Sequence, residues 1–110
     1  MDYRIEESNG YTIVHLSGEV DLSRSPTARK TILEYLQDGC DLLVDLSEVT
    51  YIDSSGVASL VEGFQVSRQK ALDFALIGVS DAAMSVLQLA RLDRVFPIFA
   101  SLQARLDAKR

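Results

Sequence analysis

The chain has 110 residues, 47% of them hydrophobic, so a packed domain is expected rather than a disordered segment. The formal net charge of −5 offers no basic patch to neutralise phosphates, which argues against binding to nucleic acids or anionic membranes. No apolar run approaches the length of a membrane span, and the single cysteine, Cys40, cannot form an internal disulfide. We therefore expect a cytoplasmic protein, not inserted in a membrane and monomeric when free.

Hydrophobic spacing and turn residues predict alternating strands and helices. In chain order these are strands at 3–7 and 11–17, a helix from Ser25 to Gly39, a strand at 41–46, a helix at 55–69, a strand at 73–78, a helix from Ser80-Asp81, a strand at 95–99 and a terminal helix from Ser101. Asn9-Gly10 is typical of a hairpin turn between the first two strands. Pro97 indicates that the last strand lies at a sheet edge.

This order predicts an α/β fold. A strand, a helix and a second strand in succession imply a parallel crossover, and the hairpin adds an antiparallel pair at one side. We expect one domain over residues 1–110, with a four- to five-stranded mixed β-sheet and about four helices packed mainly on one side. In such sheets, functional side chains gather where strands end and helices begin.

Two of these strand ends carry acids. Gly18-Glu19-Val20-Asp21 follows the second strand, and Asp53-Ser54-Ser55-Gly56 separates the third strand from a helix. Free N–H groups and the positive end of the dipole at a helix start tolerate a phosphate on an exposed hydroxyl. If the two strands are parallel, Asp21 and Asp53 approach Ser54 from two loops. The pattern predicts a phosphorylation switch.

Each of these residues also has a plainer explanation. Asp53-Ser54-Ser55 is equally typical of a helix N-cap, and Gly18 to Asp21 of a turn. Asp45 is expected to face solvent near the end of its strand, and His15 to be structural. Tyr51 and Ile52 are expected to continue the core.

An enzymatic function has little support. One histidine and one cysteine cannot form a His/Cys zinc site, so no metal site is expected, although carboxylates could hold a hard cation weakly. A serine–histidine–aspartate triad would require His15 to meet Ser54 or Ser55, and no Gly-x-Ser-x-Gly sequence surrounds either serine. Without a glycine-rich phosphate loop, no cofactor is expected and we predict that the chain is not an enzyme.

Three segments together resemble the STAS domain, and in particular the bacterial anti-sigma-factor antagonists. They are Leu16-Ser17-Gly18-Glu19-Val20-Asp21, the run from Leu43 to Gly56 (Leu-Val-Asp-Leu-Ser-Glu-Val-Thr-Tyr-Ile-Asp-Ser-Ser-Gly) and Leu92-Asp93-Arg94-Val95-Phe96-Pro97-Ile98-Phe99. The resemblance covers essentially the whole chain.

The resemblance implies a partner-switching protein. In such families the first serine of the motif, here Ser54, accepts phosphate from a serine kinase that is also an anti-sigma factor. The unmodified antagonist binds this kinase, and a PP2C-type serine phosphatase restores the binding form. Asp21 and Asp53 match positions that shape recognition, while Ser55 and Gly56 complete the helix start.

The chain also departs from the family pattern. Val57-Ala58 stands where many relatives carry Leu-Gly, and Arg91 where a glycine often ends the third helix. These departures affect which surface the protein offers to a partner, and therefore which partner it binds.

Two other functions are considered. One is a non-switching STAS interaction subunit, such as the cytoplasmic component of a lipid-transport complex, in which Ser54 is not modified. The other is a small enzyme or a receiver-like protein that is phosphorylated on Asp45. A receiver needs paired acids after its first strand and a lysine after its last, and the lysines here are only Lys30, Lys70 and Lys109.

Overall fold

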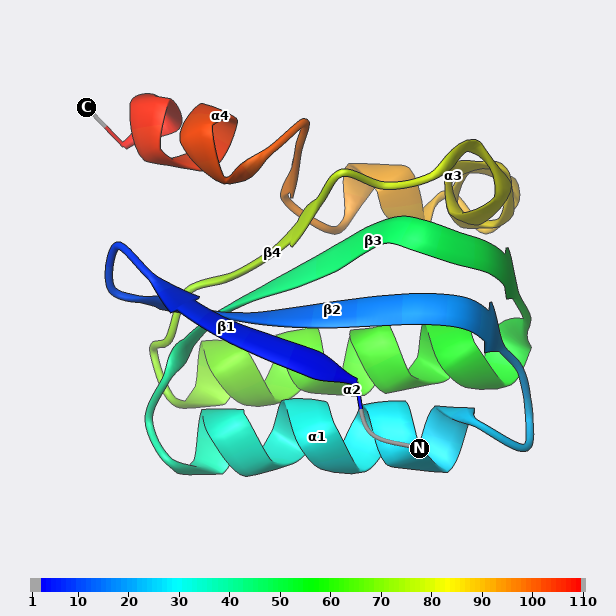
Figure 1. Cartoon of the computed structure of the whole chain (residues 1–110), viewed down its shortest axis with the longest axis horizontal. Coiled ribbons are helices and arrows are strands. Elements are labelled where there is room, and N and C mark those ends of the chain that lie inside the picture. Colours follow the sequence, from blue (N-terminus) through cyan, green and yellow to red (C-terminus); the bar gives the residue numbers. More distant parts are fainter. Residues whose placement is uncertain (1–2, 110) are drawn as a thin grey trace.

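A five-stranded mixed sheet runs through the middle of the computed structural model, which describes residues 3–109 (Figure 1). Its elements are β1 (Arg4–Ser8), β2 (Tyr11–Val20), α1 (Ser25–Gln37), β3 (Asp41–Ile52), α2 (Ser54–Gln69), β4 (Phe74–Ile77), α3 (Asp81–Leu89), a 3-10 turn η1 (Leu92–Arg94), β5 (Ile98–Phe99) and α4 (Leu102–Ala108). The strand order is β1-β2-β3-β4-β5; β1 and β2 are antiparallel and the other pairs parallel. The predicted fold class is confirmed.

The hairpin between β1 and β2 has the turn that its sequence predicts. Asn9 and Gly10 have φ angles of 54° and 84°, and two consecutive left-handed residues suit the twist of an antiparallel pair. Ser8 and Tyr11 face each other across the turn. This pairing places β1 at one edge of the sheet, while β5 forms the other edge as Pro97 predicts.

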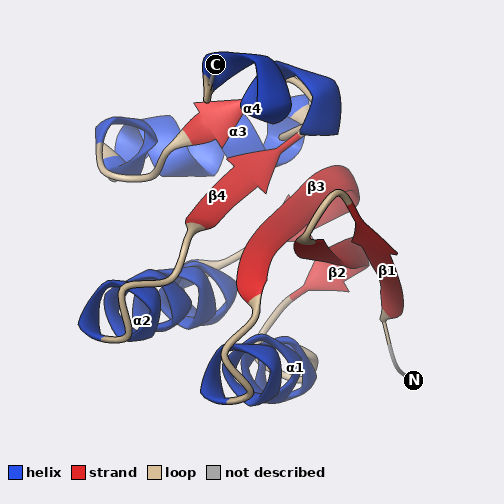
Figure 2. Cartoon of the chain, turned by 90° about the vertical axis from the view of Figure 1, so that its left-hand side faces the viewer, coloured by secondary structure: helices blue, strands red, loops and turns tan. Residues whose placement is uncertain are grey.

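Three of the helices build the main hydrophobic core. α1 and α2 lie side by side against one face of the sheet (Figures 1 and 2), and α3 adds Ala83 and Leu87 to the same core. Side chains from the sheet and these helices that are entirely inaccessible to solvent include Val14, Val44, Leu46, Ile32, Leu36, Leu60 and Leu87. The helices therefore pack mainly on one side, as expected.

α4 lies over the opposite face of the sheet. Leu102 and Leu106 pack there against a smaller cluster that includes Ile13 and Leu43. Charged groups hold the helix in place, because Asp73 accepts hydrogen bonds from the Tyr11 hydroxyl and Arg105 Nη2, both at 2.6 Å, and lies 2.9 Å from Lys109 Nζ. Burial by itself would raise the pKa of Asp73, but hydrogen bonds from Tyr11, Lys109 and Arg105 outweigh it and lower the pKa to about 2.

Both central strands run further than the apolar pattern predicts. β2 continues to Val20 rather than residue 17, and β3 to Ile52 rather than residue 46. The register shifts between His15 and Ser17 and again between Gly18 and Glu19, and each time β3 advances one residue more than β2, so the bulges lie in β3; Gly18 in β2 has a φ of 69°. A bulge interrupts the alternation from which a strand is recognised in sequence, which explains the short prediction of β3. In β2 the prediction stops just before Gly18, a residue type that is uncommon inside strands.

Three smaller predictions are corrected by the structure, because local sequence patterns do not fix where an element begins or ends or which side chains the fold buries. α1 begins at Ser25 with Arg24 as its N-cap, so Ser25 is not the cap. The last strand contains only Ile98–Phe99. The expectation that Tyr51 continues the core is wrong, since its side chain is 49% exposed, whereas Ile52 is buried as expected.

Candidate functional site

The candidate site lies where β2 and β3 end together, at the right-hand side of Figure 1. The two strands are parallel, as the sequence hypothesis requires, and Val20 pairs with Ile52 in the last step of their register. The backbone N–H of Asp53 donates to the carbonyl of Val20 at 3.4 Å. The loop that leads into α1 and the start of α2 are therefore neighbours at one edge of the sheet.

Asp53 is the N-cap of α2. Its Oδ1 accepts hydrogen bonds from the backbone N–H groups of Ser55, at 2.9 Å, and Gly56, at 3.2 Å, and from the Ser55 hydroxyl. The Ser55 hydroxyl, with the N–H groups of Gly56, Ser55 and Leu22, holds the pKa of Asp53 below its ordinary value. The carboxyl is thus ionised at neutral pH, and its charge is satisfied by the helix start.

The two serines of the motif have different surroundings. Ser55 is half-buried, and its hydroxyl is engaged by Asp53. Ser54 is exposed as the first residue of α2, and its hydroxyl makes no side-chain hydrogen bond within residues 3–109. Of the two, Ser54 presents the hydroxyl that another molecule can reach.

Gly56 lets the start of α2 approach the strand ends. A Cβ at this position would lie 2.6 Å from the carbonyl oxygen of Val20 and 2.7 Å from Cγ1 of Ile52. Both distances are far shorter than a van der Waals contact, so only glycine fits without movement. The glycine is required by this close approach, because its φ is not in the left-handed region. This close approach of α2 to the strand ends determines where Ser54 lies relative to the sheet edge.

Asp21 closes the neighbouring loop. Its Oδ1 accepts from the Ser23 backbone N–H at 3.0 Å, the Ser23 hydroxyl at 2.7 Å and the Arg24 N–H at 3.1 Å. The Ser23 hydroxyl and then these N–H groups lower the pKa of Asp21. Within residues 3–109 no hydrogen bond joins the Asp21 side chain to Asp53 or Ser54. The loop that contains Asp21 instead contacts Asp53 through Leu22, whose backbone N–H helps to lower the pKa of Asp53.

A groove between α2 and α3 begins at Ser54 and was not predicted. It has a volume of about 870 Å³, and its apolar lining residues are Val57, Ala58, Val61, Val86, Leu89 and Ala90. The sequence does hint at it, because Ala58 adds an exposed apolar residue to α2 beside Val61, which packs only partly into the core. Leu89 at its rim is 87% exposed, and Leu22 in the loop beside Asp53 is 76% exposed.

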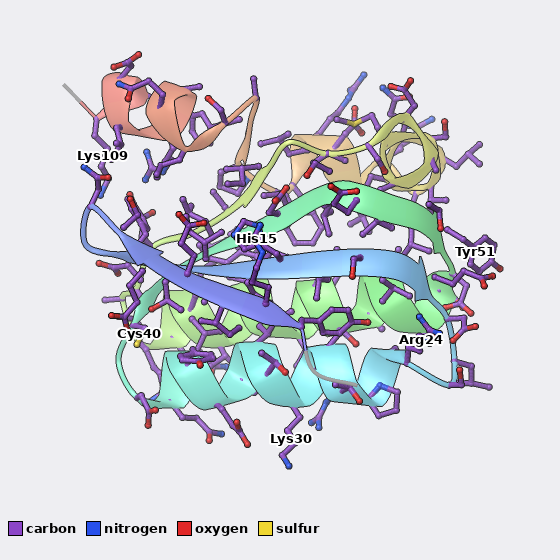
Figure 3. All side chains as sticks on the ribbon, in the orientation of Figure 1. His15, Arg24, Lys30, Cys40, Tyr51 and Lys109 are labelled. Atoms are coloured by element: carbon purple, nitrogen blue, oxygen red, sulfur yellow. The ribbon has the colours of Figure 1, made fainter. Side chains whose placement is uncertain are left out.

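His15 and Asp45 form a separate cluster in the middle of the sheet (Figure 3). His15 Nδ1 lies 2.6 Å from Asp45 Oδ2, and its Nε2 lies 2.9 Å from Glu6 Oε1. The expectation that Asp45 faces solvent near a strand end is wrong, because β3 continues for seven residues beyond it. Seven residues of extended strand span about 23 Å, and His15 pairs with Asp45 at the far end of that stretch. His15 is therefore too far from Ser54 and Ser55 to form a triad with either.

Within residues 3–109 no group of three or more histidine, cysteine, aspartate or glutamate side chains is placed to hold a metal ion. Over the same range no helix has both the length and the apolar character needed to span a membrane.

Fold and site together define a small mixed α/β domain whose distinguishing surface feature is an exposed serine at a helix start beside an apolar groove. The chain belongs to the STAS domain family, whose model matches residues 2–104. It is similar to the anti-sigma-B factor antagonist of Listeria monocytogenes, with 28% identity over 94 residues that cover 84% of this chain and 82% of the relative.

Two solved structures extend the comparison. A STAS domain protein from Planctomyces limnophilus, described as an anti-sigma-factor antagonist, aligns with a TM-score of 0.86 at 25% identity, covering 98% of this chain and 97% of that one. The Bacillus cell fate determinant SpoIIAA in its phosphorylated form aligns with a TM-score of 0.74 at 20% identity, covering 98% and 99%, which shows the shared fold alone.

Proposed function

We propose that this chain is an anti-sigma factor antagonist whose binding to a serine-kinase anti-sigma factor is controlled by phosphate on Ser54. The observation that carries the proposal is the exposed, unengaged hydroxyl of Ser54 at the start of a 16-residue helix. Membership of the STAS family and similarity to named antagonists support the role. In this proposal the unphosphorylated form binds the kinase, and a PP2C-type serine phosphatase removes the phosphate.

The physical basis of the switch is a local change in charge. Phosphate would add about −1.5 to −2 charges at neutral pH. The start of α2 would offset only ~0.3–1 kcal/mol of this, and part of its donor capacity is already used by the ionised Asp53. A partner that covers Ser54 must remove the phosphate from water, which costs several kcal/mol when no cation pairs with it. Because about 1.4 kcal/mol is a factor of ten, we expect at least a ~100-fold loss of affinity.

The test uses the purified chain with each serine-kinase anti-sigma factor encoded in its source genome. Incubation with ATP should add a single phosphate that mass spectrometry places on Ser54, and a PP2C-type phosphatase from the same genome should remove it. Ser54→Ala should keep binding the kinase in the presence of ATP, and Ser54→Glu should bind more weakly than wild type.

Ser55→Ala is the matched control, because the Ser55 hydroxyl already donates to Asp53. This variant should still accept phosphate on Ser54. Equal affinity of the kinase for the phosphorylated and unmodified chain would contradict the proposed switch. Stable binding to a transporter component, with no phosphate added by any kinase, would instead favour a non-switching STAS subunit.

A further inference from the structure

The groove between α2 and α3 starts at the candidate phosphorylation site and leads away from it. Ser54 lines one end, and on α2 the lining continues as far as Gln65. Eleven residue steps along an α-helix correspond to about 16 Å, or three turns. The groove therefore has room for a row of side chains from a partner helix rather than for one side chain.

The lining of this groove is apolar and almost uncharged. Among the described residues that line it, only Glu62 carries a charge. The carboxylate of Glu62 is held by the guanidinium of Arg29 on α1, with Nε and Nη2 at 2.6 Å and 2.8 Å from its two oxygens. Because that charge is paired, the surface complements an uncharged apolar face and disfavours a charged one.

Leu89 gives the groove an apolar rim that the fold itself does not use. Leu89 is 87% exposed as the last residue of α3, and it lines the groove together with the exposed Ala58 of α2. A leucine that is left in water at the edge of an apolar groove is a candidate anchor for a partner, because covering it removes apolar area from water. Ala58 contributes a methyl group where a glycine would leave the floor deeper.

We infer that this groove receives the uncharged apolar ridge of an amphipathic helix from the serine-kinase anti-sigma factor, with Leu89 and Ala58 determining which helix fits. The inference rests on the proposed function and adds the partner's contact element to it. A helix seated in the groove ends against Ser54. Phosphate there places about two negative charges at the mouth of a groove that is otherwise neutral, and the apolar ridge cannot compensate them.

Two variants test the groove without touching Ser54. Leu89→Ala removes the rim, and because the apolar area that leucine would bury is lost, the Kd for the kinase should rise about 10- to 30-fold, or about 1.4–2 kcal/mol. Ala58→Phe fills the floor and should weaken binding at least as much. Binding is measured by calorimetry with ADP-loaded kinase and the unphosphorylated chain. Both positions are exposed, so circular dichroism and the Tm should match wild type.

Val95→Ala is the matched control, since Val95 is an apolar residue 51% exposed outside the groove, and its Kd should stay within twofold of wild type. If wild type binds and both groove variants bind within twofold of it, the inference is overturned while the switch stands. If wild type neither binds nor accepts phosphate, both fail together. A dimer of this chain that Leu89→Ala dissociates, with kinase binding unchanged, would show a second copy as the occupant and overturn the inference.

Discussion

Replacing Gly56 with alanine tests whether the close contact of α2 with the strand ends positions Ser54. The new Cβ would lie 2.6 Å from the Val20 carbonyl oxygen, 2.7 Å from Ile52 Cγ1 and 3.0 Å from Val20 Cγ1. A carbon–oxygen contact is normally about 3.3 Å or longer, so α2 must move outward by roughly 0.7 Å. The carbonyl belongs to a paired strand and cannot turn aside as the end of a side chain can.

The expected cost of this movement follows from two opposing effects. Overpacking of this kind destabilises a domain by about 1–3 kcal/mol, whereas alanine stabilises a helix by ~1 kcal/mol relative to glycine. Because the clashing oxygen is a backbone atom, the overpacking cost should lie at about 2–3 kcal/mol, and we expect Gly56→Ala to lower the free energy of unfolding by about 1–2 kcal/mol, measured by urea denaturation. The displaced start of α2 should also slow phosphorylation of Ser54 in protein that is still folded.

Gly63→Ala is the matched control because it introduces a clash in the same helix, away from Ser54. Its Cβ would meet Ile32 Cγ2 at 2.7 Å and Phe74 Cε2 at 3.1 Å, which are side-chain atoms of the core. It should destabilise the fold but leave kcat/KM for Ser54 phosphorylation near the wild-type value. The reasoning is refuted if Gly56→Ala is as stable as wild type, or if the two variants slow phosphorylation equally.

Three further predictions concern the supports of the site and of α4. Ser80→Ala removes the N-cap of α3 and the 2.7 Å hydrogen bond that the Ser80 hydroxyl donates to the carbonyl of Val49. Urea denaturation should therefore show a free energy of unfolding about 1–2 kcal/mol lower than that of wild type. Ser85→Ala, on the exposed side of α3, is the control and should change this free energy little. The pKa of Asp73 is lowered to about 2, so its stabilising contribution is complete above its ordinary pKa near 4 and disappears as the pH falls through about 2. The stability difference between wild type and Asp73→Asn, about 1–2 kcal/mol after allowance for solvent screening, should therefore shrink over that range in acid titrations of unfolding; an unchanged difference at low pH would argue against the cluster. Asp53→Asn should retain the start of α2 better than Asp53→Ala, as measured by hydrogen exchange of the Gly56 amide, because the asparagine oxygen still accepts its N–H; equal exchange in both would show that the cap is not needed.

Much of the site could be predicted because its hydrogen bonds connect residues close in sequence. Asp53 caps the amides two and three residues ahead, and Asp21 does the same with Ser23 and Arg24. The plain explanations of both segments, as a cap and as a turn, are therefore confirmed as geometry, and they leave the Ser54 hydroxyl exposed. The strand and helix order follows from hydrophobic periodicity for the same local reason.

What the sequence alone determined is thus the order of elements, the hairpin at Asn9-Gly10, the family resemblance and a serine at the start of a helix. Only the tertiary structure decided that the Asp21 loop lies beside Asp53, that Gly56 is needed for a close approach to Val20, and that α2 and α3 line an open groove. These features join residues some thirty positions apart through strand register, bulges and helix packing. Periodicity and capping rules extend over only a few residues, so they carry no information about such contacts.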